Sequence, residues 1–321
     1  MAFDLEKARE VIRIEAEAVA ALESRIDATF VRAVEVLFRC AGRVIVSGMG
    51  KSGIIAQKLA ATLSSTGTAA MFLHPAEAAH GDLGMVMPGD VVILISKSGR
   101  TEEFYVLIPL FKRLGIPIIA MTGNLHSPLA ERADVVLDTS VKQEACPHDL
   151  APTASAVAAM AMGDALAIAL LQARDFTKED FALRHPGGSL GRKLLLRIED
   201  VMYAGDKVAS ISETAGLDEI ILEISSKRFG ATCVLDVGGR LVGIITDGDL
   251  RRLLKNRTAL DGIMARDIMT RTPRTVHLGT LASQVLEMME DLNIMQIIAV
   301  DADHRPVGMA HLHDLLKAGV A

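Results

Sequence analysis

The chain has 321 residues and a net charge of −6, and 50% of its residues are hydrophobic while only 3% are aromatic. This length allows about two domains, and the hydrophobic content excludes a disordered chain. Because aromatic rings are scarce and no run of basic residues is present, we expect no nucleic-acid partner.

Cysteine usage and hydropathy predict a cytoplasmic protein without a membrane partner. The three cysteines, Cys40, Cys146 and Cys233, are scattered, which fits a reducing compartment better than a disulfide framework. The chain is charged from Asp4 onward, so no secretory segment is expected. The least charged stretch, residues 150–163, is shorter than the roughly 20 residues that a membrane-spanning helix requires.

The first predicted element is helical. Between residues 4 and 40, apolar residues such as Leu5, Ile12 and Val19 recur at near-helical spacing among charged residues, with no Gly or Pro between them. We therefore assign residues 1–32 to an N-terminal helix.

Short aliphatic strands then alternate with helical stretches, which predicts an α/β fold with a doubly wound, parallel, five-stranded sheet over residues 33–176. A long Ala-rich helix is expected from Thr153 to about Ala173. Ligands of such sheets bind beyond the carboxyl ends of the strands, so we seek the chemistry in the loops that follow them. The predicted strands span residues 44–46, 70–73, 91–95, 116–120 and 135–137.

An internal repeat with an offset of about 65 residues begins after Arg192. The Asp-Val-Met run at 200–202 recurs as Asp-Ile-Met at 267–269, and the segment around Gly243 recurs around Gly308. Two copies are too few for a solenoid, so we predict an α+β pair that packs against itself. The predicted linker and the two copies span residues 177–200, 201–260 and 267–321.

The first candidate loop, Ser47-Gly-Met-Gly-Lys-Ser-Gly53, lies between a strand and a helix. Its glycines match the dinucleotide pattern G-x-G-x-x-G, but the next strand ends at His74 rather than at an acidic residue that could hold a ribose. A Walker A loop is excluded because Ile45 stands where its first Gly is required. The backbone N–H groups and Ser52 are suited to an anion at a helix N-terminus, and the alternative is a tight turn that binds nothing.

The second candidate loop, Ser96-Lys-Ser-Gly-Arg-Thr101, also follows an apolar strand and precedes a helix. The hydroxyl groups of Ser96, Ser98 and Thr101 around one Gly predict a neutral phosphate cradle. The alternative is a helix N-cap with Glu102 or Glu103 as its capping-box partner, although one hydroxyl group suffices for a cap.

The two loops together resemble the sugar isomerase (SIS) domain, and segments 74–84, 144–147, 150–153 and 185–188 look like those of the D-arabinose-5-phosphate isomerases. The repeat looks like a tandem CBS pair (cystathionine β-synthase type), an arrangement common in that family. The resemblance implies reversible isomerisation of D-ribulose 5-phosphate and D-arabinose 5-phosphate, which leads to Kdo and lipopolysaccharide. It also implies a homotetramer.

The resemblance places the four catalytic positions of the family at Lys51, Glu103, Glu144 and His185. Isomerisation through an enediolate needs a base near the substrate carbons, an acid–base group at the oxygens and a stabilising positive group. We expect Glu144 to be the base and Lys51 to stabilise the enediolate. His185 would open the sugar ring or relay a proton, and Glu103 would position Lys51 or a substrate hydroxyl.

Each of these roles has an alternative. Glu103 is also suited to a helix cap or a surface position, and Lys51 to a plain counter-charge for phosphate. His185 lies beyond the main α/β body, so it could serve the site of a neighbouring subunit.

His74, His80 and Asp82 form a local cluster; histidine with a carboxylate can hold Zn²⁺, but the spacing matches no structural zinc pattern. We expect them to contact sugar hydroxyls or to form a satisfied polar cluster. His74 is kept as a weak ligand for a non-essential Zn²⁺ ion, and no cofactor is required because Lys51 can supply positive charge. The turn at Gly67 and Thr68 either borders the sugar or caps a helix.

The segment 243–249 of the first copy resembles the CBS nucleotide signature, which implies that Thr246 faces a phosphate and Asp249 a ribose. In the second copy Asp314 is retained, but His311 replaces the hydroxyl. We expect a regulatory sensor for a nucleotide or a nucleotide-sugar such as a CMP-sugar. The alternative is an oligomerisation module without a ligand.

Two other functions stay open from the sequence: a phosphosugar-sensing regulatory protein and an isomerase of another phosphosugar. A regulator would need a helix-turn-helix, and the N-terminal helix offers no basic recognition segment. The substrate itself is not selected by the sequence, because the selecting contacts are made to hydroxyls and depend on shape.

Overall fold

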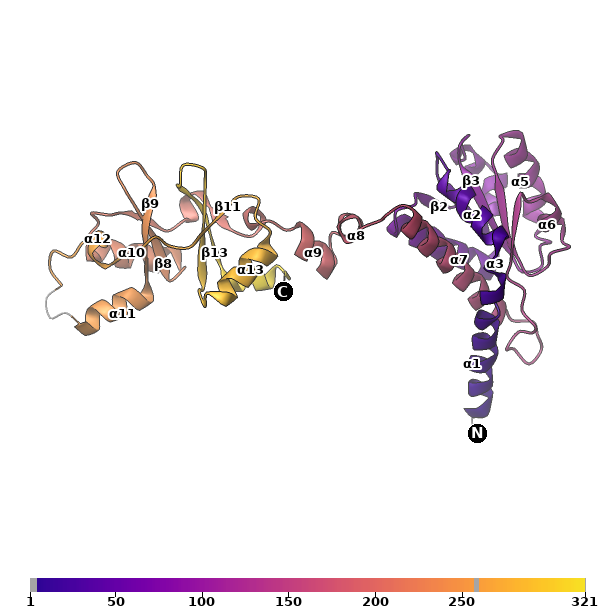
Figure 1. Ribbon diagram of the computed structural model, residues 1–321, viewed down its shortest axis with the longest axis horizontal. Helices are drawn as coiled ribbons and strands as arrows, with labels where there is room; N and C mark the ends of the chain where they lie inside the picture. Colours follow the sequence, from indigo (N-terminus) through magenta and orange to yellow (C-terminus); the bar gives the residue numbers. More distant parts are fainter. Residues whose placement is uncertain (1–4, 257–259, 321) are drawn as a thin grey trace. The chain divides into compact units, whose positions relative to one another are not determined.

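The computed structural model describes residues 5–256 and 260–320, which divide between Phe181 and Ala182 into two compact units (Figure 1). Residues 1–4 of the predicted N-terminal helix, residues 257–259 of the first predicted repeat and residue 321 of the second lie outside the described residues.

The N-terminal segment is divided into two helices rather than one. Helix α1 spans Leu5–Ala20, a short 3-10 turn η1 spans Glu23–Arg25, and α2 spans Ala28–Phe38. The division arises at Asp27, whose carboxylate accepts hydrogen bonds from the N–H groups of Thr29 and Phe30 and so starts a new helix. Helical spacing alone did not reveal this capping residue within the segment.

The first unit contains the predicted parallel five-stranded sheet, with all five predicted strands present. Their order is β2-β1-β3-β4-β5, so the order reverses between β1 and β3. The strands span Val44–Gly48 (β1), Ala70–Phe72 (β2), Val91–Ser96 (β3), Ile118–Thr122 (β4) and Val135–Asp138 (β5).

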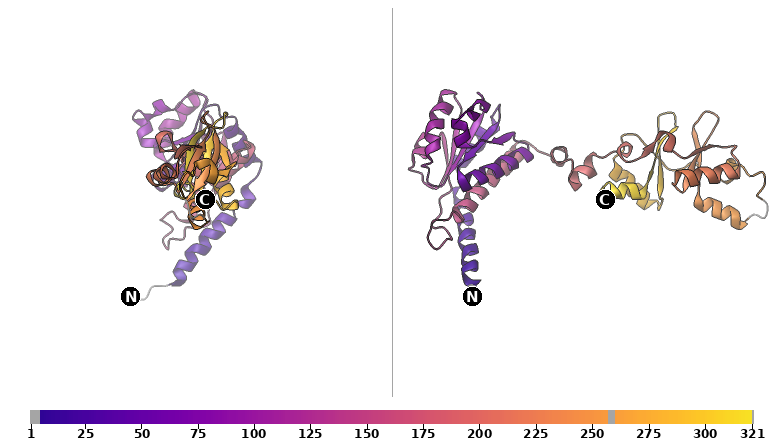
Figure 2. Two further views of the ribbon diagram at one scale, coloured as in Figure 1. Left: turned by 90° about the vertical axis from the view of Figure 1, so that its left-hand side faces the viewer. Right: turned by 180° about the vertical axis from the view of Figure 1, so that it is seen from behind.

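Helices cover both faces of this sheet, which confirms the doubly wound prediction (Figures 1 and 2). Alternate strand residues serve opposite faces: Val44 and Val46 pack with α2, α3 and α7, whereas Ile45 packs with α4, α5 and α6. The remaining elements of the unit span Gly50–Ser65 (α3), Pro75–Ala79 (α4), Asp82–Met85 (η2), Glu102–Arg113 (α5), Pro128–Arg132 (α6) and Ala154–Ala173 (α7).

Helix α7 corrects the expectation that the apolar stretch is too short to span a membrane. It has 20 residues and is apolar enough to cross a bilayer by length and composition, but half of its most apolar window is buried in the unit. It packs against α2 and α3, and its Asp164 pairs with Lys58 of α3. The burial and this ion pair describe a core helix.

The second unit contains two mixed four-stranded sheets, ordered β10-β9-β8-β7 and β11-β12-β13-β6. Its helices are α9 (Ser189–Leu195), α10 (Leu217–Lys227), α11 (Asp247–Asn256), α12 (Ala265–Ile268), α13 (Ala282–Asp291) and α14 (Leu312–Lys317), with α8 (Lys178–Arg184) before them and short 3-10 turns at Ile198–Asp200 (η3) and Gly205–Lys207 (η4). Its strands span Tyr203–Ala204 (β6), Ser210–Ser212 (β7), Ala231–Leu235 (β8), Leu241–Thr246 (β9), Thr270–Arg271 (β10), Thr275–His277 (β11), Gln296–Val300 (β12) and Pro306–His311 (β13).

The two repeat copies exchange their first short strands. Strand β6 pairs with β13 of the second copy, and β10 pairs with β9 of the first. Met202 and Met269 likewise each pack against a glycine of the other copy. A Cβ added to Gly308 would lie 2.1 Å from the sulfur of Met202, and one added to Gly243 would lie 2.4 Å from that of Met269. The repeat boundaries drawn from the sequence therefore do not coincide with the sheets.

Candidate active site

The loops after β1 and β3 lie on either side of the point where the strand order reverses. In the first loop the backbone passes so close to α3 that a Cβ on Gly53 would lie 2.6 Å from the carbonyl oxygen of Gly48. Gly50 has φ of +55°, a conformation that few other residues adopt. The glycines thus let strand and helix approach, and Lys51 and Ser52 follow in the first turn of α3.

The second loop holds its hydroxyl groups together. Ser96 and Thr101 are hydrogen-bonded through their side-chain oxygens at 2.8 Å, and the N–H of Gly99 donates to Ser96 Oγ at 3.1 Å. Thr101 precedes α5, but its side chain makes no capping hydrogen bond to the helix. The N-cap alternative therefore does not account for Thr101. Ser98 is exposed, and its Oγ accepts from the N–H of Arg100.

One cavity joins these loops at the carboxyl end of the sheet. Lys51 and Ser52 line it from the first loop, Lys97 from the second, and Ser155 from the start of α7. Thr139 adds a third hydroxyl group, and apolar side chains that include Ile95 complete the lining. The cavity therefore brings two cations and three hydroxyl groups to the place where the parallel sheet predicts a ligand.

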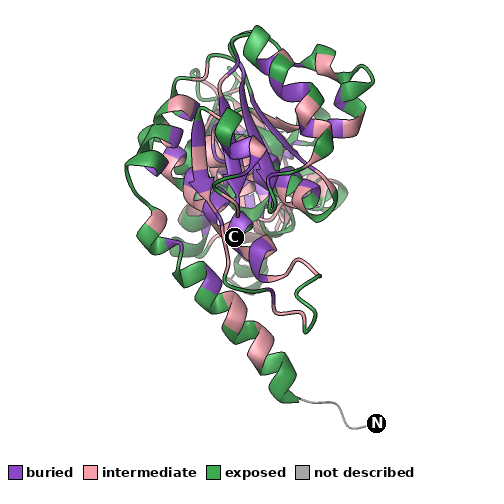
Figure 3. Ribbon diagram, turned by 90° about the vertical axis from the view of Figure 1, so that its right-hand side faces the viewer, coloured by how far each residue is buried: buried purple, intermediate pink, exposed green. Residues whose placement is uncertain are grey.

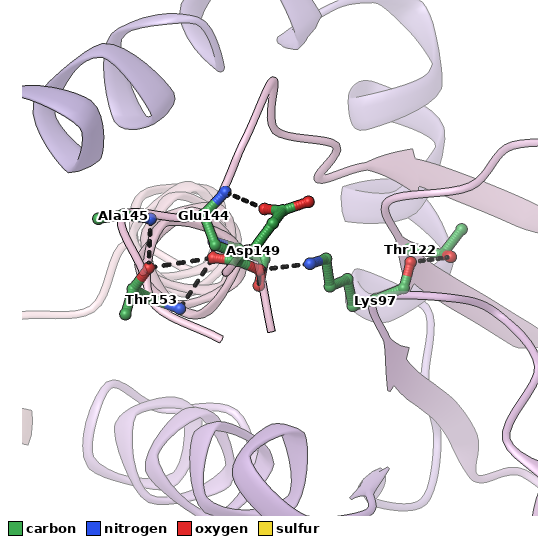
Figure 4. Close-up of polar contacts among 7 residues, drawn as sticks. Lys97, Thr122, Glu144, Ala145, Asp149 and Thr153 are labelled. Carbon is green, nitrogen blue, oxygen red and sulfur yellow. Dashed lines mark hydrogen bonds and ion pairs between the residues drawn. The ribbon is translucent and has the colours of Figure 1, made fainter. Parts of the chain in front are cut away.

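Glu144 lies beside this cavity, in the loop between β5 and α7 (Figure 4). It is 3% exposed, and its carboxylate accepts hydrogen bonds from Thr153 N at 2.8 Å, Thr153 Oγ1 at 3.2 Å and Ser155 N at 3.1 Å. The hydroxyl of Ser155 also donates to it, and Lys97 Nζ lies 2.6 Å from its Oε1. The loop is held in turn by Asp149, whose Oδ1 accepts from Glu144 N at 2.6 Å.

These contacts set the proton affinity of Glu144. Burial raises the pKa of the carboxyl group, but the Lys97 ammonium, the Ser155 hydroxyl and the N–H groups of Thr153 and Ser155 outweigh burial and lower the pKa to about 2. The Glu144 side chain is therefore ionised throughout the physiological range, and in this arrangement it is a weak base.

The two remaining predicted catalytic residues are placed differently. Glu103 is half-buried in the first turn of α5, just after the hydroxyl-rich loop. His185 belongs to the second unit, where its carbonyl oxygen accepts the N–H of Gly188. A Cβ on Gly191 would lie 2.2 Å from that same oxygen, so the turn around His185 is closely packed. The catalytic roles of both residues stay predictions.

The histidine cluster flanks α4, with His74 at its N-terminus and the exposed His80 at its C-terminus. Nδ1 of His74 is buried without a hydrogen-bond partner among the described residues, and its ring meets that of Phe72 edge-on. Within the part of the chain that the structure describes, no three His, Cys, Asp or Glu side chains gather as a metal site. The weak Zn²⁺ ligand at His74 thus gains no further ligands from these residues.

Gly67 and Thr68 lie away from these loops, because they precede β2 and so stand at the amino edge of the sheet. Gly67 has φ of +99°, and a Cβ there would lie 2.5 Å from the Phe176 ring. Thr68 donates its N–H to Leu63 O and accepts from Arg174 Nε at 3.1 Å. The helix C-cap alternative therefore accounts for this turn, and the geometry of this chain does not support its contact with the sugar.

The predicted nucleotide residues line two separate pockets of the second unit. Thr246 and Asp249 line one pocket but also bond to each other, since Thr246 Oγ1 donates to Asp249 Oδ2 at 2.6 Å in a capping box at the start of α11. Asp249 is further paired with Arg252. Asp314 and His311 line the other pocket.

Sequence reasoning missed Lys97, Thr153 and Ser155 as partners of the buried Glu144. Lys97 was visible as the charged residue of the second loop, and its position at the end of β3 pointed to the same sheet edge as Glu144. Thr153 and Ser155 were visible as hydroxyl residues at the start of a predicted helix, where backbone N–H groups are free to bind an anion.

Comparison with known proteins extends these observations over the whole chain. The family model described as the SIS domain matches residues 37–169, and the model described as the CBS domain matches residues 198–256 and 265–321. The arabinose 5-phosphate isomerase KdsD of Pseudomonas aeruginosa is 51% identical over 98% of this chain and 97% of its own length. KdsD of Escherichia coli K12 is 50% identical over 99% of this chain and 97% of its own length.

A solved structure is similar to the first unit. A protein of Escherichia coli CFT073 in complex with arabinose 5-phosphate is 44% identical and covers 57% of this chain and 97% of that chain, with a TM-score of 0.54.

The buried carboxylate leads to a prediction about stability and pH. Because the folded pKa of Glu144 is about 2 and its ordinary value is 4.5, its ionised form stabilises the fold above pH 4.5, and this contribution is lost as the pH falls towards 2. Glu144→Gln should therefore lower the free energy of unfolding by about 3 kcal/mol at pH 7. The difference from wild type, measured by urea unfolding, should shrink steadily between pH 4.5 and 2.

Glu131→Gln is the matched control, because Glu131 is an exposed acid on α6. It should unfold like wild type at every pH. A destabilisation by Glu144→Gln that does not change with pH would contradict the assignment of a low pKa to Glu144.

Proposed function

The chain belongs to the arabinose 5-phosphate isomerases that carry an SIS domain and two CBS domains, and we propose that it interconverts D-ribulose 5-phosphate and D-arabinose 5-phosphate through an enediolate. The observation that carries this proposal is the cavity lined by Lys51, Ser52 and Lys97 beside the buried carboxylate of Glu144. Cations at this position can stabilise an anionic sugar phosphate and an enediolate. The product would feed Kdo and lipopolysaccharide synthesis.

The phosphate would be held by hydroxyl groups and backbone N–H groups of the two loops. Ser52 lies in the first turn of α3, where unpaired N–H groups and the helix dipole favour an anion. Ser96, Ser98 and Thr101 add hydroxyl groups from the second loop, which is followed by the start of α5. A dianion can be held in this way despite the negative net charge of the chain, since the loops act locally.

Four side chains would share the proton transfers and the stabilisation of charge. Glu144 would move the proton between C1 and C2, and Lys51 would stabilise the negative charge that develops on the oxygens. His185 would open the sugar ring or carry the proton between oxygens, and Glu103 would position Lys51 or a hydroxyl. Because Glu144 is a weak base while it is paired with Lys97, proton removal requires that this pair be loosened when substrate is bound.

No cofactor is required in this proposal, because the two lysines of the cavity can supply the positive charge that a metal ion supplies in other enzymes. A Zn²⁺ ion at His74 would be non-essential, since one imidazole is a poor site without two or three further ligands.

The purified protein should convert arabinose 5-phosphate to ribulose 5-phosphate, and it should act far more slowly on ribose 5-phosphate and glucose 6-phosphate. Glu144→Gln should lower kcat by about 100-fold or more, because general-base catalysis contributes factors of this size. Ketose formation, measured by a coupled or colorimetric assay, checks both statements.

Glu131→Gln serves as the control here too, and it should retain wild-type turnover. Ketose formed faster from ribose 5-phosphate or glucose 6-phosphate would favour an isomerase of another phosphosugar. Binding of a sugar phosphate without turnover of any of the three would favour a phosphosugar-sensing regulatory protein.

The CBS pair would sense a nucleotide or a CMP-sugar, and the pocket at Asp314 is the better site. Tyr203, Lys207, Lys227, Arg228 and His311 line this pocket with it, which provides an aromatic ring beside several positive groups. A nucleotide combines a flat base with a phosphate, and these groups match both parts. In the first copy, by contrast, Asp249 is already engaged by Thr246 and Arg252.

A thermal-shift screen with AMP, ATP and CMP-sugars tests this site. A ligand at 100 times its Kd should stabilise the fold by about 2.7 kcal/mol and raise Tm accordingly. Lys207→Ala should reduce the shift, whereas Arg266→Ala, an exposed change on α12, should not. The absence of a shift with all of these ligands would favour an oligomerisation module without a ligand.

The protein would assemble as a homotetramer. Leu5 and Ile12 on α1 are each 68% exposed and Val19 is 36% exposed, and their spacing of seven residues places them on one side of the helix. Figure 3 shows that most of α1 is exposed. A stripe of this kind is stabilised when another chain covers it, and we propose that the second copy does so. A cytoplasmic location agrees with the three free cysteines.

Light scattering should give wild-type protein the mass of four 34.3 kDa chains. Ile12→Glu should lower this mass, because it places a charge in the apolar stripe, whereas the neighbouring Arg13→Gln should leave it unchanged. A mass of one chain for the wild type, or a tetramer in Ile12→Glu, would contradict the assembly through α1.

A further inference from the structure

The two side chains of the Lys97–Glu144 ion pair differ in how exposed they are and in how firmly they are held. The Glu144 side chain is 0% exposed and is also held by Thr153 and Ser155 at the start of α7. The Lys97 side chain is 45% exposed and lies on a four-carbon stem. If the pair opens, it is therefore Lys97 that moves, while Glu144 stays where α7 holds it.

The position of Lys97 suits such a movement. Its backbone is anchored, because its carbonyl oxygen accepts the N–H of Gly123 at 3.0 Å and lies 3.5 Å from Thr122 Oγ1 (Figure 4). Its ammonium group carries three N–H donors, of which one serves Glu144. Its side chain lines the same cavity as Lys51 and Ser52, so an anion in that cavity would lie next to Lys97.

We propose that Lys97 is an exchangeable counter-ion, which pairs with Glu144 in the free enzyme and transfers to the anionic substrate when the substrate enters the cavity. This inference rests on the proposed isomerase function. Lys97 keeps its proton throughout, and the proton taken from the substrate carbon goes to Glu144 and returns to the neighbouring carbon. The exchange gives Lys97 a direct part in the reaction that the sequence did not suggest.

The exchange would couple substrate binding to the strength of the base. With Lys97 in place, burial of Glu144 is outweighed and its pKa is about 2. When Lys97 leaves, burial is opposed only by the hydrogen bonds from Thr153 and Ser155, so the pKa of Glu144 rises and the carboxylate becomes a stronger base. The base is then strengthened only in the substrate complex.

Other charged and titratable groups surround Glu144, and they must be held constant in a test. Asp149 and Cys146 belong to its own loop, Lys7 and Glu10 of α1 line a pocket with it, and Lys51 lies across the cavity. A comparison of variants that differ only at position 97 keeps all of these groups the same. Differences between their pH profiles therefore report on Lys97.

The experiment measures kcat and kcat/KM against pH with arabinose 5-phosphate for wild type, Lys97→Met and Lys97→Arg. In wild type the acid limb of kcat, which reports the substrate complex, should lie at higher pH than that of kcat/KM, which reports the free enzyme. Lys97→Met should move the acid limb of kcat/KM upward by about 1–3 pH units. It should also raise KM by about 10-fold, which corresponds to one lost charged contact.

Lys97→Arg retains the charge and should keep the two acid limbs separated as in wild type. Lys112→Met, which removes an exposed lysine in the last turn of α5, should behave like wild type and is the matched control. Because Lys97→Met leaves a buried carboxylate without its cation, folding of each variant is checked by circular dichroism. If Lys97→Met does not fold, Lys97→Arg still tests the proposal. Acid limbs of kcat and kcat/KM that coincide in Lys97→Arg would overturn the exchange.

Two results with Lys97→Met would also overturn the inference. An unmoved acid limb of kcat/KM in Lys97→Met would show that Lys97 does not control Glu144. A moved limb with an unchanged KM would show that Lys97 does not pass to the substrate. Absence of wild-type turnover is a separate outcome, because it would remove the isomerase function and the inference together.

Discussion

The site depends on one constraint, which is that the buried carboxylate of Glu144 must be surrounded by donors. An ionised group inside a protein is strongly unfavourable unless hydrogen bonds and a counter-charge replace its water. Thr153 and Ser155 supply them from the N-terminus of α7, where the helix dipole also favours a negative charge, and Lys97 supplies the counter-charge from the end of β3. The same contacts therefore fix the loop after β5, the start of α7 and the hydroxyl-rich loop relative to one another. One network thus holds the loop that is predicted to bind the phosphate and the residue that is predicted to be the base.

The sheet was predictable because its strands are continuous aliphatic runs separated by helices. Each predicted strand is present, with shifts of one or two residues at its ends, as for Ile118–Thr122 against the predicted 116–120. The N-terminal segment differed from the single predicted helix because the side chain of Asp27 caps a second helix. Helical spacing of apolar residues does not detect such a cap. Length was likewise a poor guide for α7, which is long and apolar enough to cross a bilayer although half of its most apolar window is buried in the unit.

The candidate site was predictable only where residues follow strands in the chain. Ser52 and Glu144 follow strands of one parallel sheet and Ser96 ends another of its strands, so their gathering at one edge follows from topology. Topology also places Lys97 at this edge, but its ion pair with Glu144 was not predictable, because the meeting of Lys97 with a loop 47 positions further along the chain depends on how β3 and β5 lie in the sheet. Gly67 was misplaced for the opposite reason: the turn precedes a strand, which puts it at the far edge.

The exchange of short strands between the two repeat copies has a consequence for the history of the chain. Each copy supplies an edge strand to the other sheet and a methionine that fills the space beside the other copy's glycine. Loss of either copy would leave the survivor with an unpaired sheet edge and a bare apolar face, which invites aggregation. Once the duplication had occurred, it could therefore not easily be reversed by deletion. Changes at Gly243 and Gly308 are constrained by Met269 and Met202 of the other copy, so the two halves are expected to evolve as a matched pair.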